Sequence, residues 1–98
     1  MSELEKEFGK FCSNKFGKDL DGRFRKFLEE AGELLGAFQQ YTISPTDESL
    51  AHLKDELSDV QAVISHIGHL LGTNSQELIQ EAKIKIETRE VDNNFRRY

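Results

Sequence analysis

The sequence contains few of the residues that interrupt helices or cross-link a chain. Its 98 residues include one proline, one cysteine and no tryptophan. A single cysteine cannot form a disulfide within the chain, and with Pro45 as the only proline, helices can run long. No apolar run reaches the length of a signal peptide or of a membrane span. We therefore expect a soluble, cytoplasmic protein with no membrane partner.

Basic charge is also scarce. The chain has 13 lysines and arginines against 18 acidic residues, which gives a formal net charge of -5. Proteins that bind nucleic acids usually present a basic face to the phosphates, so we expect no nucleic-acid partner. The excess of carboxylates is better suited to binding a metal ion. The length allows one small domain, for which association between subunits is a natural supplement to a modest core.

Apolar residues recur every three or four positions in four segments, which is typical of amphipathic helices. The sequence predicts an all-α fold with a short helix over 3–16 and longer helices over 20–43, 47–71 and 75–90. We expect one domain, 1–98, in which residues 91–98 are mobile or fold over a neighbouring subunit. The predicted breaks between helices carry a glycine or proline followed by candidate N-caps: Gly17 with Asp19 or Asp21, Pro45 with Thr46 or Asp47, and Gly72 with Thr73 or Ser75.

The two central helices carry the longest apolar stripes. On the second helix the stripe consists of Phe24, Phe27, Leu28, Ala31, Leu34, Leu35 and Phe38. On the third it consists of Leu50, Leu53, Leu57, Val60, Ile64, Ile67 and Leu71, widened by Val63 and Leu70. Moving the second helix along by 26 positions places Phe24, Phe27, Ala31, Leu34 and Phe38 on Leu50, Leu53, Leu57, Val60 and Ile64. The sequence thus predicts that these helices pack together around a shared region.

Acidic pairs interrupt both stripes. At about 100° per residue, Glu30 falls at the edge of its stripe and Glu33 just beyond it, while Glu56 falls inside its stripe and Asp59 on the border. An ionised carboxylate in an apolar seam needs a basic partner, a shifted pKa or a metal ion. If the helices pack antiparallel, the four carboxylates converge, and Mg2+ or Mn2+ would relieve their repulsion. Glu29 points nearly opposite and is expected to be solvated or to assist from outside the ligand set.

The fourth segment carries the richest basic cluster of the chain, Lys83, Lys85 and Arg89. These side chains could bind substrate phosphates, since arginine can hold two oxygens at once. The alternative is an ordinary solvated helix face, which includes pairing of Glu81 with Lys85 four residues on. Both interpretations stay open.

Histidine and cysteine are not expected at the acidic cluster. His66 and His69 point away from the apolar centre of their helix and from Glu56, which predicts a role at the surface or in a subunit interface rather than metal binding. Cys12 lies in the apolar stripe of the first helix and is predicted to be a small buried hydrophobe. Oxygen ligands alone favour magnesium or manganese over zinc.

The two acidic motifs, Glu29-Glu30-x-x-Glu33 and, after 22 intervening residues, Glu56-x-x-Asp59, resemble the metal-binding signature of the MazG-like, all-α nucleoside triphosphate pyrophosphohydrolases. The resemblance covers about residues 20–90. It implies a four-helix MazG-like fold whose bundle is completed by oligomerisation, as a homodimer or homotetramer. It also implies that Glu30, Glu33, Glu56 and Asp59 hold Mg2+, or Mn2+ in its place, and that Glu29 assists or orients.

The same resemblance implies an activity, the hydrolysis of a nucleoside triphosphate to a monophosphate and pyrophosphate by attack of water at the α-phosphate. This would serve house-cleaning or control of the nucleotide pool. Glu29, Glu30, Glu33, Glu56 and Asp59 would be the catalytic residues, and Lys83, Lys85 or Arg89 would hold the distal phosphates. Phe11, Phe16 and Phe27 are candidates for walls of a base pocket, although core packing explains them equally well.

Two other functions remain open on the sequence. One is a phosphoribosyl-ATP pyrophosphatase-like enzyme from the same structural superfamily, which also releases pyrophosphate. The other is a non-enzymatic helical interaction module, in which the acids keep the bundle solvated or neutralise basic partners. A stability increase with divalent cations would separate the enzymes from the module, and substrate profiling would separate the two enzymes.

Overall fold

The computed structural model describes residues 3–91, and every element within that range is an α-helix. The helices are α1 (Glu3–Phe16), α2 (Leu20–Ile43), α3 (Asp47–Leu70) and α4 (Ser75–Val91). The all-α prediction is confirmed, and the predicted helix boundaries agree to within one residue. The prediction of a mobile tail falls largely on residues 92–98, which lie outside the described residues. None of the described helices is both long and apolar enough to cross a membrane.

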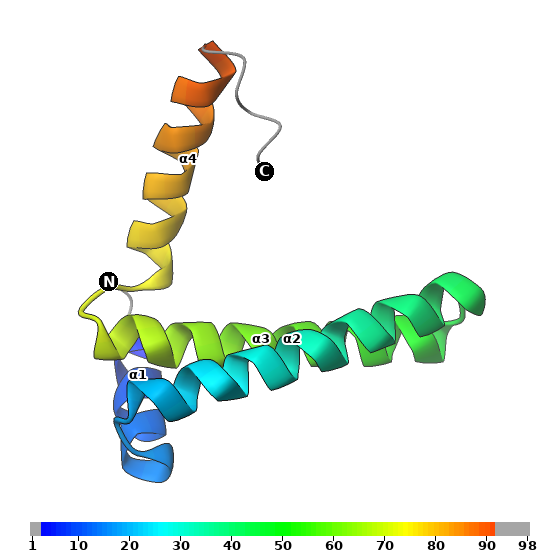
Figure 1. The fold of residues 1–98 in the computed structure, drawn as a ribbon, viewed down its shortest axis with the longest axis horizontal. Coiled ribbons are helices and arrows are strands. Elements are labelled where there is room, and N and C mark those ends of the chain that lie inside the picture. Colours follow the sequence, from blue (N-terminus) through cyan, green and yellow to red (C-terminus); the bar gives the residue numbers. More distant parts are fainter. Residues whose placement is uncertain (1–2, 92–98) are drawn as a thin grey trace.

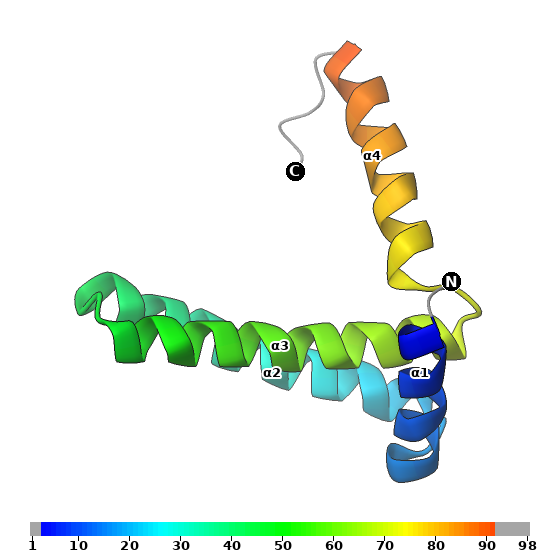
Figure 2. The ribbon, with the colours of Figure 1, turned by 180° about the vertical axis from the view of Figure 1, so that it is seen from behind.

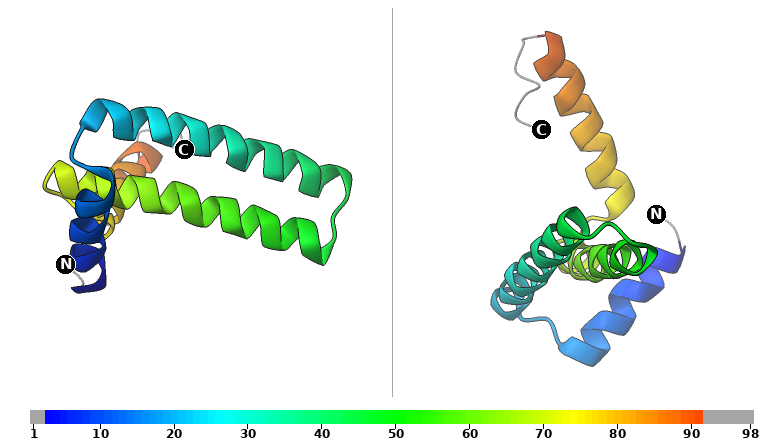
Figure 3. Two further views of the ribbon diagram at one scale, coloured as in Figure 1. Left: turned by 90° about the horizontal axis from the view of Figure 1, so that it is seen from below. Right: turned by 90° about the vertical axis from the view of Figure 1, so that its right-hand side faces the viewer.

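The two long helices form an antiparallel hairpin. Asp19 is the N-cap of α2, and Thr46 with Ser49 forms a capping box at the start of α3. The three residues 44–46 connect α2 to α3, so the helices run back along each other (Figure 1). At the other end of the hairpin, α1 crosses on one side and α4 projects on the opposite side, as the view from behind also shows (Figure 2). The hairpin and α4 therefore form an L with α4 as the shorter arm (Figure 1), and the right-hand view of Figure 3 shows α4 projecting from the hairpin seen end-on.

The start of α4 is fixed, although most of the helix projects away from the hairpin. The N-cap of α4 is Asn74, whose Oδ1 accepts a hydrogen bond from the backbone N–H of Glu77, so the prediction of Thr73 or Ser75 as the cap is wrong. The Glu5 carboxylate of α1 accepts a hydrogen bond from the Ser75 backbone N–H at 2.6 Å. A carboxylate is favourable at this end of a helix because the peptide dipoles are positive there.

The contact between α1 and α3 is built around a buried histidine. His66 is 0% exposed, and its Nε2 lies 3.1 Å from the Ser13 hydroxyl. Burial, followed by the charges of Arg23 and His69, lowers the pKa of His66, which favours the neutral form of the ring. The prediction that His66 lies at the surface or in a subunit interface is wrong, because α1 covers the side of α3 that a helical wheel leaves open. Cys12 is 3% exposed beside Ser13, which confirms its prediction as a buried small hydrophobe.

Substitution of Gly9 by alanine should destabilise the chain. A Cβ at Gly9 would overlap the His69 ring, whose nearest atoms belong to its rigid base rather than to a flexible tip. Overpacking of this kind costs about 1–3 kcal/mol, which exceeds the helix propensity that alanine gains over glycine. Urea unfolding would measure the change, with Gly36→Ala as the control, because nothing lies within 4 Å of a Cβ at that position. A Gly9→Ala variant as stable as the control would show that α1 does not pack here.

The apolar stripes of α2 and α3 are divided between two sides of the hairpin. Val60, Val63 and Ile67 of the α3 stripe are buried between the helices or under α1, and so is Ala37 of α2, which lies outside the predicted stripe. Other members of the stripes are between 48% and 70% exposed, and we call these the apolar face: Phe24, Leu28, Leu35, Phe38, Leu57 and Leu71. The predicted stripes thus contain both a seam within the chain and a face that no described residue covers.

Candidate metal centre

The antiparallel packing of α2 and α3 brings the two acidic motifs together near the middle of the hairpin. Glu30, Glu56 and Asp59 can each offer an oxygen within 4.8 Å of the others. Glu29, Glu30 and Glu33 form a second such group, so Glu30 is shared between the two. The structure therefore brings together the five acids that the sequence singles out, which we call the acidic cluster.

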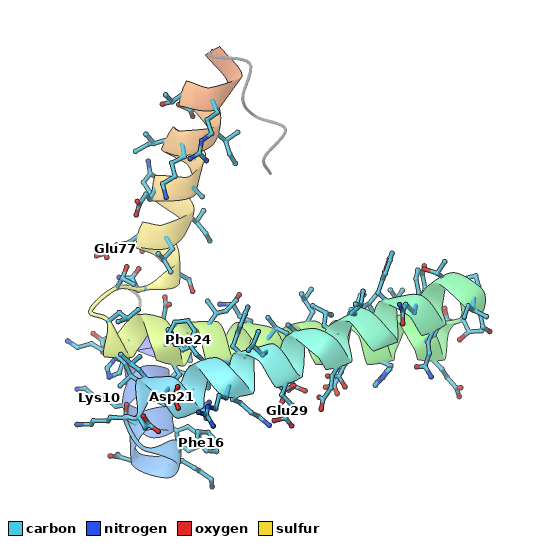
Figure 4. The ribbon with its side chains drawn as sticks, in the orientation of Figure 1. Lys10, Phe16, Asp21, Phe24, Glu29 and Glu77 are labelled. Atoms are coloured by element: carbon cyan, nitrogen blue, oxygen red, sulfur yellow. The ribbon has the colours of Figure 1, made fainter. Side chains whose placement is uncertain are left out.

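Burial differs sharply within the acidic cluster. Glu30 is 7% exposed, Glu56 is half-buried, and Glu29, Glu33 and Asp59 are exposed. The helical wheel placed Glu56 inside its apolar stripe and Glu30 only at the edge, whereas in the structure Glu30 is the more buried of the two. Glu29 lies on the side of the hairpin away from α4 (Figure 4). The cluster therefore has a buried floor and a rim open to solvent, on the opposite side from the apolar face.

The two floor carboxylates are only partly satisfied. Glu30 Oε1 lies 3.0 Å from the Lys26 ammonium, and Glu56 Oε1 lies 4.0 Å from His52 Nε2. The second oxygen of each, Oε2, is buried, and neither has a hydrogen-bond partner among residues 3–91. A buried polar atom left without a partner costs about 1–3 kcal/mol. These two oxygens are therefore available to coordinate a cation from the buried side of the cluster.

Lys26 is a member of the site that the sequence analysis did not identify. Its ammonium bridges Glu30 and Glu29, at 3.0 and 3.4 Å. The hydrogen bond to Glu30 is the main reason that the pKa of Lys26 is raised, followed by desolvation, which acts in the opposite direction. The available signal was the four-residue spacing between Lys26 and Glu30, but such pairs are common on solvated helices.

One lysine does not neutralise the cluster. The pKa of Glu33 is raised, chiefly by the negative charge of Glu30, with smaller contributions from desolvation, from a hydrogen bond with Glu30 and from the charges of Glu56 and Glu29. At a pH between the ordinary pKa of a glutamate and the raised pKa of Glu33, the folded chain therefore holds a proton that the unfolded chain has released. The metal-free protein should therefore lose stability as pH rises from the ordinary pKa of a glutamate through the raised pKa of Glu33. A bound cation would remove this penalty.

The donor set fits a hard divalent cation. Every convergent ligand atom is a carboxylate oxygen, and the two buried Oε2 atoms provide ready positions for coordination. Oxygen-only sites of this kind select Mg2+ or Mn2+ rather than Zn2+. His52 reaches only the edge of Glu56, and His66 belongs to the contact with α1. The absence of histidine from the predicted ligand set therefore agrees with where the described histidines lie.

The predicted phosphate-binding residues lie elsewhere. Lys83, Lys85 and Arg89 are on α4, which projects from the opposite side of the hairpin (Figure 1). Lys85 lies 3.3 Å from Glu81, and Lys83 lies 3.9 Å from Glu87, which are the ordinary pairings of a solvated helix. Among the described residues of one chain, the structure thus does not bring this basic cluster to the acids.

The three candidate base-pocket aromatics are also dispersed. Phe11 and Phe16 are both 55% exposed on α1, and the Arg23 guanidinium lies 5.0 Å from the centre of the Phe16 ring. Phe27 lines a groove beside α4, away from the acidic cluster.

The chain matches no protein-family model, and searches of curated protein sequences and of solved structures found no significant match.

Proposed function

We propose that this protein is a Mg2+-dependent nucleoside triphosphate pyrophosphohydrolase of the MazG-like type. The reaction would convert a nucleoside triphosphate and water to a monophosphate and pyrophosphate. The observation that carries the proposal is the pair of buried, unpartnered oxygens of Glu30 and Glu56, contributed by facing helices and surrounded by three further acids. A purely structural acid would be expected to have both of its oxygens paired or solvated. Mn2+ is the expected substitute for Mg2+.

Each acid then has a role that its position supports. Glu30 and Glu56 would hold the cation from the floor, and Glu33 and Asp59 would complete its ligands from the rim. When bound, the cation would supply charge neutralisation for the triphosphate and a lowered pKa for the attacking water. Glu29 is exposed at the rim, where its contact with Lys26 orients it, and it would accept a proton from that water.

Pyrophosphate release from a panel of ribo- and deoxynucleoside triphosphates, together with phosphoribosyl-ATP, would test the proposal. We expect equal amounts of pyrophosphate and monophosphate with Mg2+ or Mn2+, and neither with chelator. A Glu48→Gln variant serves as the control, because Glu48 is an exposed carboxylate on α3 outside the acidic cluster. It should retain full activity.

The other outcomes of this panel each reject the proposal in a different way. Release from phosphoribosyl-ATP alone would assign the chain to the pyrophosphatase-like alternative. Orthophosphate as the product would place the attack at a different phosphorus. No release from any substrate, together with no change in melting temperature on adding Mg2+, would favour the interaction module.

A further inference from the structure

His66 has the most deeply buried titratable side chain among the described residues. It is 0% exposed, and its Nε2 lies 3.1 Å from the Ser13 hydroxyl of α1. The second ring nitrogen, Nδ1, is also buried and has no hydrogen-bond partner within residues 3–91. A neutral ring carries one N–H, and a protonated ring carries two. Protonation would therefore leave a charged N–H donor buried without an acceptor, which costs more than leaving a neutral nitrogen unpaired.

The side chains around His66 supply no charge that would stabilise its protonated form. Burial has the largest effect in lowering its pKa, and the charges of Arg23 on α2 and His69 on α3 act in the same direction. From α1, Ser13 offers an uncharged hydroxyl, and burial raises the pKa of the neighbouring Cys12 thiol, which keeps that thiol neutral. No carboxylate in the described part of the chain is paired with the ring, so a proton here would add a second positive charge beside Arg23.

His66 lies in the surface by which α1 docks on α3. Cys12 and Ser13 are buried in this contact, and Gly9 comes so close to His69 that a Cβ there would overlap the ring. α1 crosses one end of the hairpin, whereas α2 and α3 pack along their length (Figure 2). A buried ring that gains a charge must be rehydrated, and moving the short α1 disrupts less packing than separating the two long helices.

The connection between α1 and α2 allows such a movement. α1 ends at Phe16, and the next residue, Gly17, has a φ of 85° and donates its N–H to the carbonyl of Ser13. Only residues 17–19 separate the two helices, and Asp19 caps α2 independently of α1. Glycine absorbs backbone rotation at little steric cost, so α1 can swing about this connection as a whole helix while the hairpin stays intact.

α1 also holds the first turn of α4. The Glu5 carboxylate accepts the hydrogen bond from the Ser75 N–H, and on the other side the Gln61 amide of α3 donates to the Ser75 hydroxyl. If α1 leaves α3, the first of these bonds is lost and the second remains. The position of α1 is therefore transmitted to the start of α4, which loosens without detaching.

We propose that His66 is a pH-sensitive switch for the docking of α1: the neutral ring keeps α1 on α3, and protonation releases α1 and frees the Ser75 N–H from Glu5. The direction follows from the lowered pKa of the docked ring. Docking is fully favoured above the ordinary histidine pKa of about 6.5 and weakens as pH falls below that value toward the lowered one. Within this window release takes up one proton, so the ratio of released to docked chains rises about tenfold per pH unit.

The reactivity of Cys12 would measure the release, because it is the only cysteine and is 3% exposed under docked α1. A dithiodipyridine reagent reacts with accessible thiols in mildly acidic solution. The rate for the metal-free folded chain is divided by the rate for the urea-unfolded chain at the same pH, which removes the pH dependence of the thiol and of the reagent. We expect this ratio to rise by up to about tenfold per pH unit as pH falls from about 6.5.

Two matched variants assign this slope to one ring. His66→Gln removes the titration and keeps an amide that can hydrogen-bond to Ser13, so its ratio should stay flat over the same range. His52→Gln removes a histidine from the same helix at a half-exposed position away from α1, and it should keep the full slope. A flat ratio in the wild-type chain, or a slope that His66→Gln retains, would overturn the proposal.

NMR of the wild-type chain keeps the test decisive if His66→Gln leaves α1 undocked at every pH. The reactivity of Cys12 must then follow the protonation of the His66 ring, and reactivity that rises while the ring stays neutral would overturn the switch. Deuterium exchange of the Ser75 N–H, relative to its intrinsic rate, should accelerate with the same slope. Unchanged protection of Ser75 while Cys12 becomes reactive would overturn the coupling to α4. None of these residues belongs to the acidic cluster, so the outcome is independent of the proposed function.

Discussion

Replacement of Glu56 by glutamine is expected to abolish Mg2+-dependent pyrophosphate release and to leave the metal-free fold unchanged or more stable. Residues that merely orient a metal ligand are worth about 10–100-fold, so loss of a direct ligand should cost at least roughly 100-fold in turnover. The change keeps the side-chain volume and removes one half-buried charge. The new amide can also donate a hydrogen bond to a neighbouring carboxylate. This bond would offset part of the free-energy cost of burying an oxygen without a partner.

The matched control is Asp55→Asn, which removes a carboxylate from the adjacent, exposed position of α3 and should leave turnover unchanged. Activity assays and urea unfolding of both variants would separate the possible roles of Glu56. Turnover retained by Glu56→Gln would show that Glu56 is not a ligand. A large loss of stability would instead assign Glu56 to a structural ion pair, because removing one member of a buried pair leaves the other charge uncompensated.

Addition of Mg2+ to the metal-free protein is expected to raise its melting temperature by about 10–20 °C. A ligand present at 100 times its Kd stabilises the folded state by about 2.7 kcal/mol, and each kcal/mol shifts the melting temperature of a chain of this size by about 4–8 °C. The gain should shrink at acidic pH, because the raised pKa of Glu33 makes protons stronger competitors for the site. Differential scanning calorimetry over a range of Mg2+ concentrations and pH values would measure both effects.

Sodium chloride at the same ionic strength is the control for general screening of the acidic charge. It should produce a much smaller shift, and the Glu56→Gln variant should lose most of the response to Mg2+. An equal response to both salts would mean that the cation acts on the net charge of -5 rather than at the acidic cluster.

The sequence predicted the four helices and the group of acids because both follow from short-range regularities. Apolar periodicity and capping residues set helix boundaries, and two amphipathic helices joined by a short turn must pack antiparallel. Glu30 and Glu56 therefore met across the hairpin as expected. Lys26 was missed because its pairing with Glu30 has the same spacing as many solvated pairs, and only the burial of Glu30 distinguishes it.

The remaining differences concern which sides of a helix its neighbours cover. A helical wheel gives the direction of His66 on α3 but does not show that α1 lies there. In the same way, it groups Phe24 and Leu28 with Phe27 in one stripe, although these residues differ in exposure once α3 occupies only one side of α2. The direction of α4 depends on contacts at its first turn, including the one from Glu5 to Ser75, that no periodicity reveals.

The three-residue connection between α2 and α3 has a consequence for how the chain folds. It lets the two longest helices pack from the connection outward, and helical topologies rich in local contacts fold in microseconds to milliseconds. The contact of α1 with α3 is different, since Ser13 and His66 are 53 residues apart. Loop closure over that distance is entropically costlier. We therefore expect the hairpin to form in the folding nucleus and α1 to dock afterwards, so that the acidic cluster assembles before the buried histidine does.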